Sequence, residues 1–176
     1  MIFFAVVVSC FPNIARSEDK AGSTIVAGSG WGKICIGTDR SEVEEILGKG
    51  EFLPKFDGVY LLIYKPKGIR VSLSNIDQTV HVIYFYNKQK GFEDFAVFNG
   101  KTSTGIDWNS TVDQVIKAYG KPIEDYSGNN TSGNWRRLAF KGIDFVYEDG
   151  RLVRICVPGT HQKESEPRKK IKKVRF

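Results

Sequence analysis

The chain offers few residues of the types that acid–base or metal chemistry needs. It contains two histidines, His81 and His161. His81 interrupts an alternating apolar run as Val80-His81-Val82, which favours an outward-facing strand residue over a ligand. No cluster of His, Cys, Asp and Glu has the spacing of a zinc or other metal site. The sequence therefore predicts neither a metal site nor a histidine-based catalytic centre.

Two further patterns that would indicate chemistry are incomplete. The run Gly28-Ser29-Gly30-Trp31-Gly32-Lys33 is rich in glycine, but it lacks the preceding strand and the Gly-Lys-Ser/Thr ending of a phosphate loop. No serine stands in a Gly-x-Ser-x-Gly arrangement. The carboxylates Glu42, Glu44 and Glu45 have the spacing of a solvated helix side. We expect a protein that is not an enzyme and that has no catalytic, cofactor-binding or metal-binding residues.

The three cysteines fall into two groups. Cys10 ends an apolar run as Val7-Val8-Ser9-Cys10, which is similar to a bacterial lipobox, whose cysteine is lipidated and becomes the new N-terminus. The alternative is cleavage further on, after Ser17, which removes Cys10. The remaining pair, Cys35 and Cys156, is compatible with one disulfide in an oxidising compartment and equally with two buried thiols.

The first residues predict an export signal. Ile2 to Val8 is an apolar run of seven residues, far below the roughly 20 residues that a membrane-spanning helix needs. Small and polar residues follow, up to Ser17-Glu18-Asp19-Lys20, as at the end of a secretory signal. No Lys or Arg precedes the run, and a buried first strand is the alternative. We expect residues 1–17 to be a signal or lipoprotein leader.

The positive charge lies in a C-terminal tail. The 176 residues carry 26 Lys and Arg against 20 Asp and Glu, a formal net charge of +6. Six of the basic residues stand at the end of the chain: Arg168, Lys169, Lys170, Lys172, Lys173 and Arg175. The preceding residues are formally neutral, so the tail carries the whole basic excess. The expected export of the protein argues against a nucleic-acid partner. We expect residues 161–176 to be a disordered basic tail that contacts an anionic membrane or cell-wall surface, or that has no binding role.

Two segments of the chain share one pattern. Ile34–Lys49 and Ile106–Lys121 align without a gap, and Ile34 and Ile106 are 72 positions apart. Each segment begins with an apolar pair two positions apart, continues with a polar residue suited to a helix N-cap, and then has an apolar helical face followed by Gly-Lys. Each segment therefore predicts a helix of about two and a half to three turns.

The ends of both predicted helices carry capping signals. Asp39 with Glu42, and Thr111 with Gln114, have the spacing of capping boxes. A glycine, Gly48 in the first copy and its counterpart in the second, stands where a left-handed C-cap is favoured.

Three strand-like segments follow each predicted helix. They are 59–64, 67–73 and 80–85 in the first copy, and 135–140, 141–147 and 152–157 in the second. Alternating apolar residues such as Ile143, Phe145 and Tyr147 predict strands buried on one face. The polar stretch Ser127–Asn134 predicts a mobile loop before a strand. The sequence thus predicts an α+β fold of two tandem repeats, each a helix plus a three-stranded antiparallel meander, packed as one body.

The predicted organisation has six parts. They are the leader 1–17, a flexible lead-in 18–33, repeat unit 1 at 34–86, an ordered connector 87–105, repeat unit 2 at 106–160 and the tail 161–176. Five aromatic residues of the strand segments either line a partner-facing sheet or fill the core: Tyr60, Tyr64, Tyr84, Tyr86 and Trp135.

The first copy contains the pattern Ile-Gly-x(2)-Arg-x(2)-Val-x(3)-Leu-Gly-Lys, which resembles the SmpA/OmlA family. That family includes the small lipoprotein of the outer-membrane barrel-assembly machinery, and similar tandem modules occur in the β-lactamase inhibitor proteins. The matching residues are Ile36, Gly37, Arg40, Val43, Leu47 and Gly48, and more loosely Trp108, Ser110, Val115, Tyr119, Gly120 and Pro122. The chain departs from the family in having two copies, Gly50 in place of the usual Pro, and a basic tail.

The resemblance implies a bacterial protein of the cell envelope. We expect an exported, non-catalytic protein, periplasmic or anchored to the outer membrane, that binds or scaffolds another envelope protein. The alternatives are a periplasmic protein similar to an enzyme inhibitor, and a binder of anionic surfaces through the basic tail.

Overall fold

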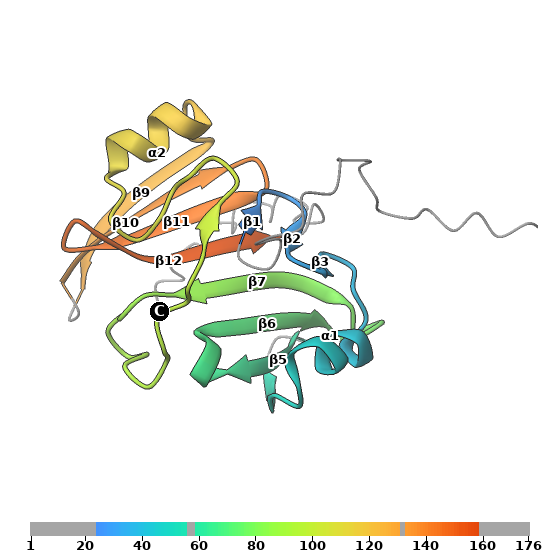
Figure 1. Ribbon diagram of the computed structural model, residues 1–176. Helices are drawn as coiled ribbons and strands as arrows, with labels where there is room; N and C mark the ends of the chain where they lie inside the picture. Colours follow the sequence, from blue (N-terminus) through green and yellow to red (C-terminus); the bar gives the residue numbers. More distant parts are fainter. Residues whose placement is uncertain (1–23, 56–58, 131–132, 159–176) are drawn as a thin grey trace, which may run out of the picture.

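The computed structural model describes residues 24–55, 59–130 and 133–158, in which strands dominate (Figure 1). Strands hold 48% and helices 15% of these residues. The two α-helices of the described part are α1 (Arg40–Leu47) and α2 (Val112–Tyr119). The predicted α+β class is therefore wrong, because the protein is mostly β and is built on a large antiparallel sheet.

Eight strands form the large sheet. In spatial order they are β4 (Glu51–Lys55), β5 (Val59–Tyr64), β6 (Ile69–Ser74), β7 (Val80–Tyr86), β12 (Arg151–Pro158), β11 (Ile143–Glu148), β10 (Gly133–Phe140) and β9 (Glu124–Asn130). All neighbouring pairs are antiparallel. The predicted three-stranded meanders are thus also wrong: α1 and α2 are each followed by four strands, and β7 and β12 join the two halves into one sheet.

In the large sheet, the strands that the prediction missed are the two edge strands. β4 contains Pro54, which has no N–H to donate and is tolerated at a sheet edge. β9 is polar and contains Gly128, yet it pairs with β10 from Asn130 opposite Gly133 to Glu124 opposite Ala139. The mobile loop predicted over 127–134 is therefore largely a pair of strands, held by backbone hydrogen bonds that the side-chain pattern does not reveal.

A second, small sheet contains residues that were predicted to be a lead-in. Its order is β3 (Ile34–Cys35), β2 (Gly30–Trp31), β1 (Thr24–Val26) and β8 (Lys101–Thr102). Ile25 is 0% exposed, and the Trp31 ring lies 5.3 Å from the Phe98 ring and 6.2 Å from the Phe85 ring. A flexible lead-in is therefore wrong for residues 24–33, because the small sheet buries apolar side chains that the Gly/Ser-rich composition hides. Residues 18–23 lie outside the described residues.

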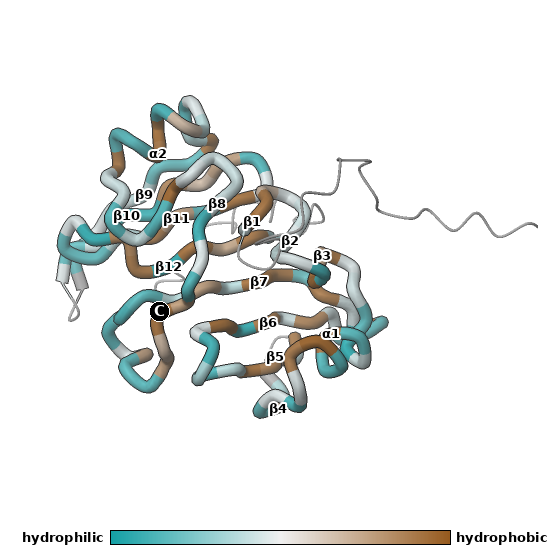
Figure 2. Tube along the Cα trace, in the orientation of Figure 1, coloured by the Kyte–Doolittle hydropathy of each residue, from teal (hydrophilic) through white to brown (hydrophobic). Residues whose placement is uncertain are grey.

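The main core lies between the large sheet and the layer formed by α1, α2 and the small sheet. Val43 of α1 and Val115 of α2 are fully buried in one cluster with the alternating strand residues. The members of this cluster from the large sheet are Leu62, Tyr64, Ile69, Val71, Leu73, Val80, Ile83, Phe85, Leu138, Phe140, Ile143, Phe145, Tyr147, Leu152, Ile155 and Val157. Figure 2 shows hydrophobic stretches along the central strands and hydrophilic ones along the outer turns.

The two helices begin differently. Thr111 caps α2: its side chain accepts a hydrogen bond from the backbone N–H of Gln114, whose own side chain accepts one from the Thr111 backbone. Asp39 precedes α1 without a side-chain capping bond, so the capping box predicted there is absent. Arg40 instead pairs with Glu44 one turn on, at 3.0 Å.

The segment between β7 and β8 crosses one end of the large sheet. It passes over the 3-10 helix Lys65–Lys67 and the glycine that follows it. Gly68 has φ +66, and a Cβ at that position would collide with the Ala96 carbonyl oxygen. Phe92 and Phe95 of this segment pack on Tyr86, with ring centroids 4.8 and 4.6 Å from that of Tyr86. The segment thus places two aromatic rings beside the central strands.

Candidate functional site

The large sheet has a second face, which points away from α1 and α2. Residues directly opposite each other in an antiparallel pair point to the same face, so the register identifies the side chains. One row across this second face is Glu51, Ile63, Arg70, Tyr84, Cys156, Asp144, Ala139 and Glu124. The next row is Tyr86, Arg154, Val146, Arg137 and Tyr126. None of these residues belongs to the main core cluster.

Four residues at the middle of the second face form what we call the arginine–tyrosine cluster: Arg70, Tyr84, Tyr86 and Arg154. Arg70 of β6 lies opposite Tyr84, and Arg154 of β12 lies opposite Tyr86. The Arg70 Cζ atom is 4.4 Å from the centre of the Tyr84 ring and 5.6 Å from that of Tyr86. These distances are those of cation–π contacts, so the guanidinium group is held over the two rings.

Two polar atoms of this cluster are buried without a partner among the described residues. They are the Nε atoms of Arg70 and Arg154. Arg70 forms a side-chain hydrogen bond with Tyr84, and Arg154 forms one with Tyr86. Tyr86 is 0% exposed, whereas Arg70, Tyr84 and Arg154 are half-buried. A buried donor that makes no hydrogen bond costs about 1–3 kcal/mol.

The carboxylates of the second face bind other cations. Asp144 lies 2.7 Å from Arg137, and Glu124 lies 3.9 Å from the same guanidinium group. Glu51 pairs with Lys65 at 3.6 Å. Within residues 24–55, 59–130 and 133–158, neither arginine of the cluster forms an ion pair. Asp144 interacts electrostatically with Arg154 without forming an ion pair with it. The cluster therefore carries two positive charges that no carboxylate of the described residues contacts directly.

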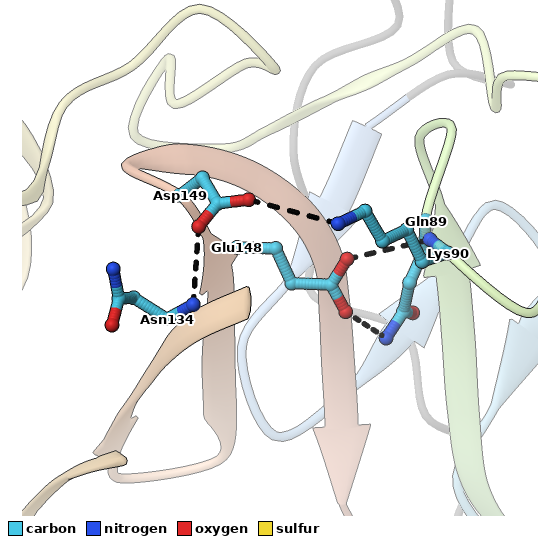
Figure 3. A network of polar contacts seen from close by, with 5 residues as sticks. All are labelled: Gln89, Lys90, Asn134, Glu148 and Asp149. Carbon is cyan, nitrogen blue, oxygen red and sulfur yellow. Dashed lines mark hydrogen bonds and ion pairs between the residues drawn. The ribbon is translucent and has the colours of Figure 1, made fainter. Parts of the chain in front are cut away.

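A polar network holds the β7–β8 segment beside the cluster (Figure 3). Glu148 accepts a hydrogen bond from the Gln89 side chain at 2.9 Å and another from the Lys90 backbone N–H at 3.3 Å. The neighbouring Asp149 accepts one from the Asn134 backbone and lies 4.0 Å from the Lys90 ammonium group. The network ties the start of the segment to the β11–β12 turn, which fixes the position of Phe92 and Phe95 against Tyr86.

Burial keeps the hydroxyl and thiol groups of this region protonated. It raises the pKa of Tyr86 to about 12, although Arg70 and Arg154 oppose the shift, and it also raises the pKa of Tyr84. Burial raises the pKa of the Cys156 thiol to about 11. At neutral pH these groups are hydrogen-bond donors rather than bases or nucleophiles. The arrangement is therefore a set of donors with two cations, which suits the binding of an anion.

The described part of the chain shows neither of two other kinds of site. Residues 24–55, 59–130 and 133–158 contain no group of three or more His, Cys, Asp and Glu side chains that could hold a metal ion. In the same ranges no helix has the length and apolar character needed to cross a membrane.

The cysteine pair is not bonded. Cys156 is a free thiol, 6% exposed, on the second face of β12. Cys35 belongs to β3 of the small sheet, which packs on the opposite face through Ile34 and Ile25. The disulfide between Cys35 and Cys156 does not form, because the large sheet lies between the two side chains. The other candidate residues lie outside the described residues: Cys10, Arg168, Lys169, Lys170, Lys172, Lys173 and Arg175.

The five candidate aromatic residues are divided between the two faces. Tyr60 and Tyr64 pack into the main core. Tyr84, Tyr86 and Trp135 lie on the second face. The Trp135 indole packs directly on Gly128, because a Cβ at Gly128 would come within 3.0 Å of the ring. Arg70 and Arg154 were not predicted as site residues from the sequence. A signal was present, because Ile69-Arg70-Val71 and Val153-Arg154-Ile155 each place an arginine inside a strand predicted to be largely buried.

Comparisons with known proteins give the chain no family. No family model and no curated protein matches the sequence. A cysteine-rich secretory protein from Staphylococcus aureus is similar in structure, with 11% identity and a TM-score of 0.46 over 79% of this chain and 49% of that chain. This chain thus spans about half the length of that protein. A DUF4309 family protein from Bacillus subtilis has 13% identity and a TM-score of 0.46 over 75% of this chain and 88% of that chain. Neither belongs to the families that the sequence pattern resembles.

Proposed function

We propose that the protein is a non-catalytic, exported protein of the cell envelope that binds another envelope protein through the second face of its large sheet. The observation that carries the proposal is the arginine–tyrosine cluster, in which the buried Nε atoms of Arg70 and Arg154 have no hydrogen-bond partner among the described residues. Natural proteins satisfy nearly all buried polar groups, so a group of unsatisfied donors on one surface favours a binding role for that surface.

The size of the second face supports a protein partner. Eight strands at about 4.8 Å spacing extend about 34 Å, and strands of six to eight residues extend about 20 Å. The resulting area of about 700 Å² is close to the roughly 800 Å² that each partner buries in a stable complex. Exposed apolar side chains stand at both edges of this face: Leu53 is 42% exposed on β4, and Tyr126 is 51% exposed on β9. Such residues contribute hydrophobic contact at an interface.

The envelope location is supported by the leader-like residues 1–17 and by the SmpA/OmlA-like pattern. Under this proposal the mature protein lacks Met1. If the lipobox reading holds, a fatty-acid analogue labels the protein and Cys10→Ser abolishes the labelling. An intact Met1 on the mature protein, observed by mass spectrometry, would contradict export.

The experiment that tests the binding surface is site-specific photo-cross-linking in cells that produce the protein. The cross-linking amino acid replaces Leu53 or Tyr126 on the second face, and Ile46 or Lys117 on the helices as matched controls, because all four positions are exposed. We expect one discrete protein adduct at both second-face positions and none at the helix positions. Adducts confined to Ile46 and Lys117, or no adduct at any position, would contradict the proposal.

A further inference from the structure

The arginine–tyrosine cluster has features that specify what part of a partner it contacts. We propose that this cluster is a carboxylate site, which receives one carboxylate group of the protein partner between Arg70 and Arg154. The inference rests on the proposed function, because it names the chemistry by which the second face recognises that partner.

The positive charges of Arg70 and Arg154 favour a bound anion. Arg70 and Arg154 both act electrostatically on Tyr84, Tyr86 and Cys156, so their guanidinium groups share one neighbourhood. Two positive charges in a partly buried region repel each other, and no carboxylate of the described residues pairs with them. A bound anion offsets this repulsion and accepts hydrogen bonds from the half-buried guanidinium groups.

The positions of Arg70 and Arg154 in the sheet allow both side chains to reach one anion. Arg70 and Arg154 lie on β6 and β12, on either side of β7, and their rows are two residues apart along the strands. Strand spacing of about 4.8 Å and a rise of about 3.4 Å per residue place their Cα atoms about 12 Å apart. Two long side chains at this separation reach one acceptor from opposite sides. Tyr84 lies between them, and Tyr86 lies beneath Phe92 and Phe95.

The place of the cluster on a sheet face indicates which kind of anion it binds. A small free anion is typically held in an enclosed pocket, but the cluster is part of a sheet face. Three depressions in the surface are lined by other residues, in the ranges 47–67, 39–78 and 112–150. A site on a sheet face suits an anion that is presented by an opposing protein surface. A carboxylate is the anionic group that polypeptides carry, on Asp and Glu side chains or at the C-terminus, and guanidinium groups bind it through two parallel hydrogen bonds.

The experiment follows the arginine Nε–Hε signals of the full-length protein by NMR. Three probes are added at physiological salt: hexaglutamate with an amidated C-terminus, an N-acetylated Gly/Ser hexapeptide with a free C-terminal carboxylate, and inorganic phosphate. The Arg70 and Arg154 signals are assigned by their loss in Arg70→Gln and Arg154→Gln. This assignment separates them from the signals of the basic tail, which contains Arg168 and Arg175.

We expect at least one carboxylate peptide to shift the Arg70 and Arg154 signals in a saturable way. The peptide that does so identifies the source of the carboxylate as a side chain or a chain end. Arg70→Gln and Arg154→Gln should each weaken this binding at least tenfold. Arg136→Gln is the matched control: it removes the same charge from the opposite face of β10, where Arg136 pairs with Asp125, and it should leave the binding unchanged.

Three outcomes overturn the inference: shifts with phosphate alone, no shift with any probe, or equal weakening by Arg136→Gln. Amide spectra of every variant check that the protein is folded. Arg70→Lys keeps the positive charge, so this variant should bind the carboxylate peptide more tightly than Arg70→Gln does. The cross-linking experiment separates the two proposals. If adducts at Leu53 and Tyr126 persist at full yield in the Arg70→Gln/Arg154→Gln double variant, the carboxylate site is wrong and the binding function stands. If wild-type adducts are absent, the binding function itself fails.

Discussion

Arg154 lies directly opposite Tyr86 where β12 pairs with β7, the junction that joins the two halves of the large sheet. Each half contributes to the arginine–tyrosine cluster, because Arg70, Tyr84 and Tyr86 come from the first half and Arg154 comes from the second. The cluster therefore exists only when the two halves pair. This placement on central strands also keeps the site rigid, which limits the entropy lost on binding.

The capping bond of α2 should contribute measurably to stability. Thr111→Ala removes a side chain that accepts a hydrogen bond from the Gln114 backbone, and we expect a loss of about 1 kcal/mol in the free energy of unfolding. Asp39→Ala is the matched control, because Asp39 makes no side-chain capping bond to α1. Urea denaturation of both variants measures the two losses. Equal losses would contradict the difference between the helix ends.

The Glu148 network should hold the β7–β8 segment in place. In Glu148→Ala, Gln89 and Lys90 lose an acceptor, so we expect faster backbone hydrogen exchange in residues 89–98 and a loss of about 1–2 kcal/mol in stability. Glu45→Ala, at an exposed position of α1, serves as the control and should leave this exchange unchanged. Unaltered exchange in Glu148→Ala would show that the other contacts of the segment hold it without Glu148, among them the hydrogen bonds from Ala96 to Lys65 and from Phe98 to Tyr86.

Asp144 should give stability a specific pH dependence. Asp144 is 7% exposed, and burial raises its pKa from 3.8 even though the nearby Arg137 lowers it. The folded protein therefore binds this proton more tightly than the unfolded chain does. Between pH 3.8 and the raised pKa the folded state holds more protons, so this contribution to stability falls as the pH rises and levels off above the raised pKa.

The comparison with Asp144→Asn isolates this effect. The free energy of unfolding of the wild type, minus that of the variant, should decrease as the pH rises from below 3.8 towards neutrality. Urea titrations of both proteins across this range measure the difference. A difference that increases with pH would mean that the ion pair with Arg137 outweighs the effect of burial.

Cys156 should be unreactive in the folded protein. With a pKa of about 11, only about one thiol in a thousand is ionised at pH 8, and the side chain is also buried. We expect iodoacetamide to leave Cys156 unmodified in the native state and to alkylate it in denaturant, as mapped by peptide mass spectrometry. Rapid alkylation of the native protein would contradict the burial of this residue.

The sequence predicted the central strands and helices better than the edges. Alternation in Ile143, Phe145 and Tyr147 located β11, because a one-sided core imposes a period of two. Pro54 and Gly128 concealed β4 and β9, since edge strands are held by the backbone of one neighbour and need no apolar side chains. These strands, together with the small sheet, change the class from the expected α+β to mostly β.

The candidate site was largely beyond reach of the sequence. Tyr84 and Tyr86 were singled out, but their partners Arg70 and Arg154 are distant along the chain, and the strand register that brings all four together was unknown. The pairing of β7 with β12 is set by how the two halves pack. A pattern within either half contains no information about it.

The most direct test of the central claim is the affinity of the partner captured at Tyr126, measured with purified proteins by isothermal titration calorimetry. Leu53→Ala/Tyr126→Ala truncates exposed side chains at both edges of the second face, while Ile46→Ala/Ile76→Ala truncates exposed side chains away from it. We predict that the first pair raises the Kd at least tenfold, about 1.4 kcal/mol, and that the second pair leaves the Kd unchanged. A Kd that rises with the second pair and not with the first would contradict the assignment of the second face as the binding surface.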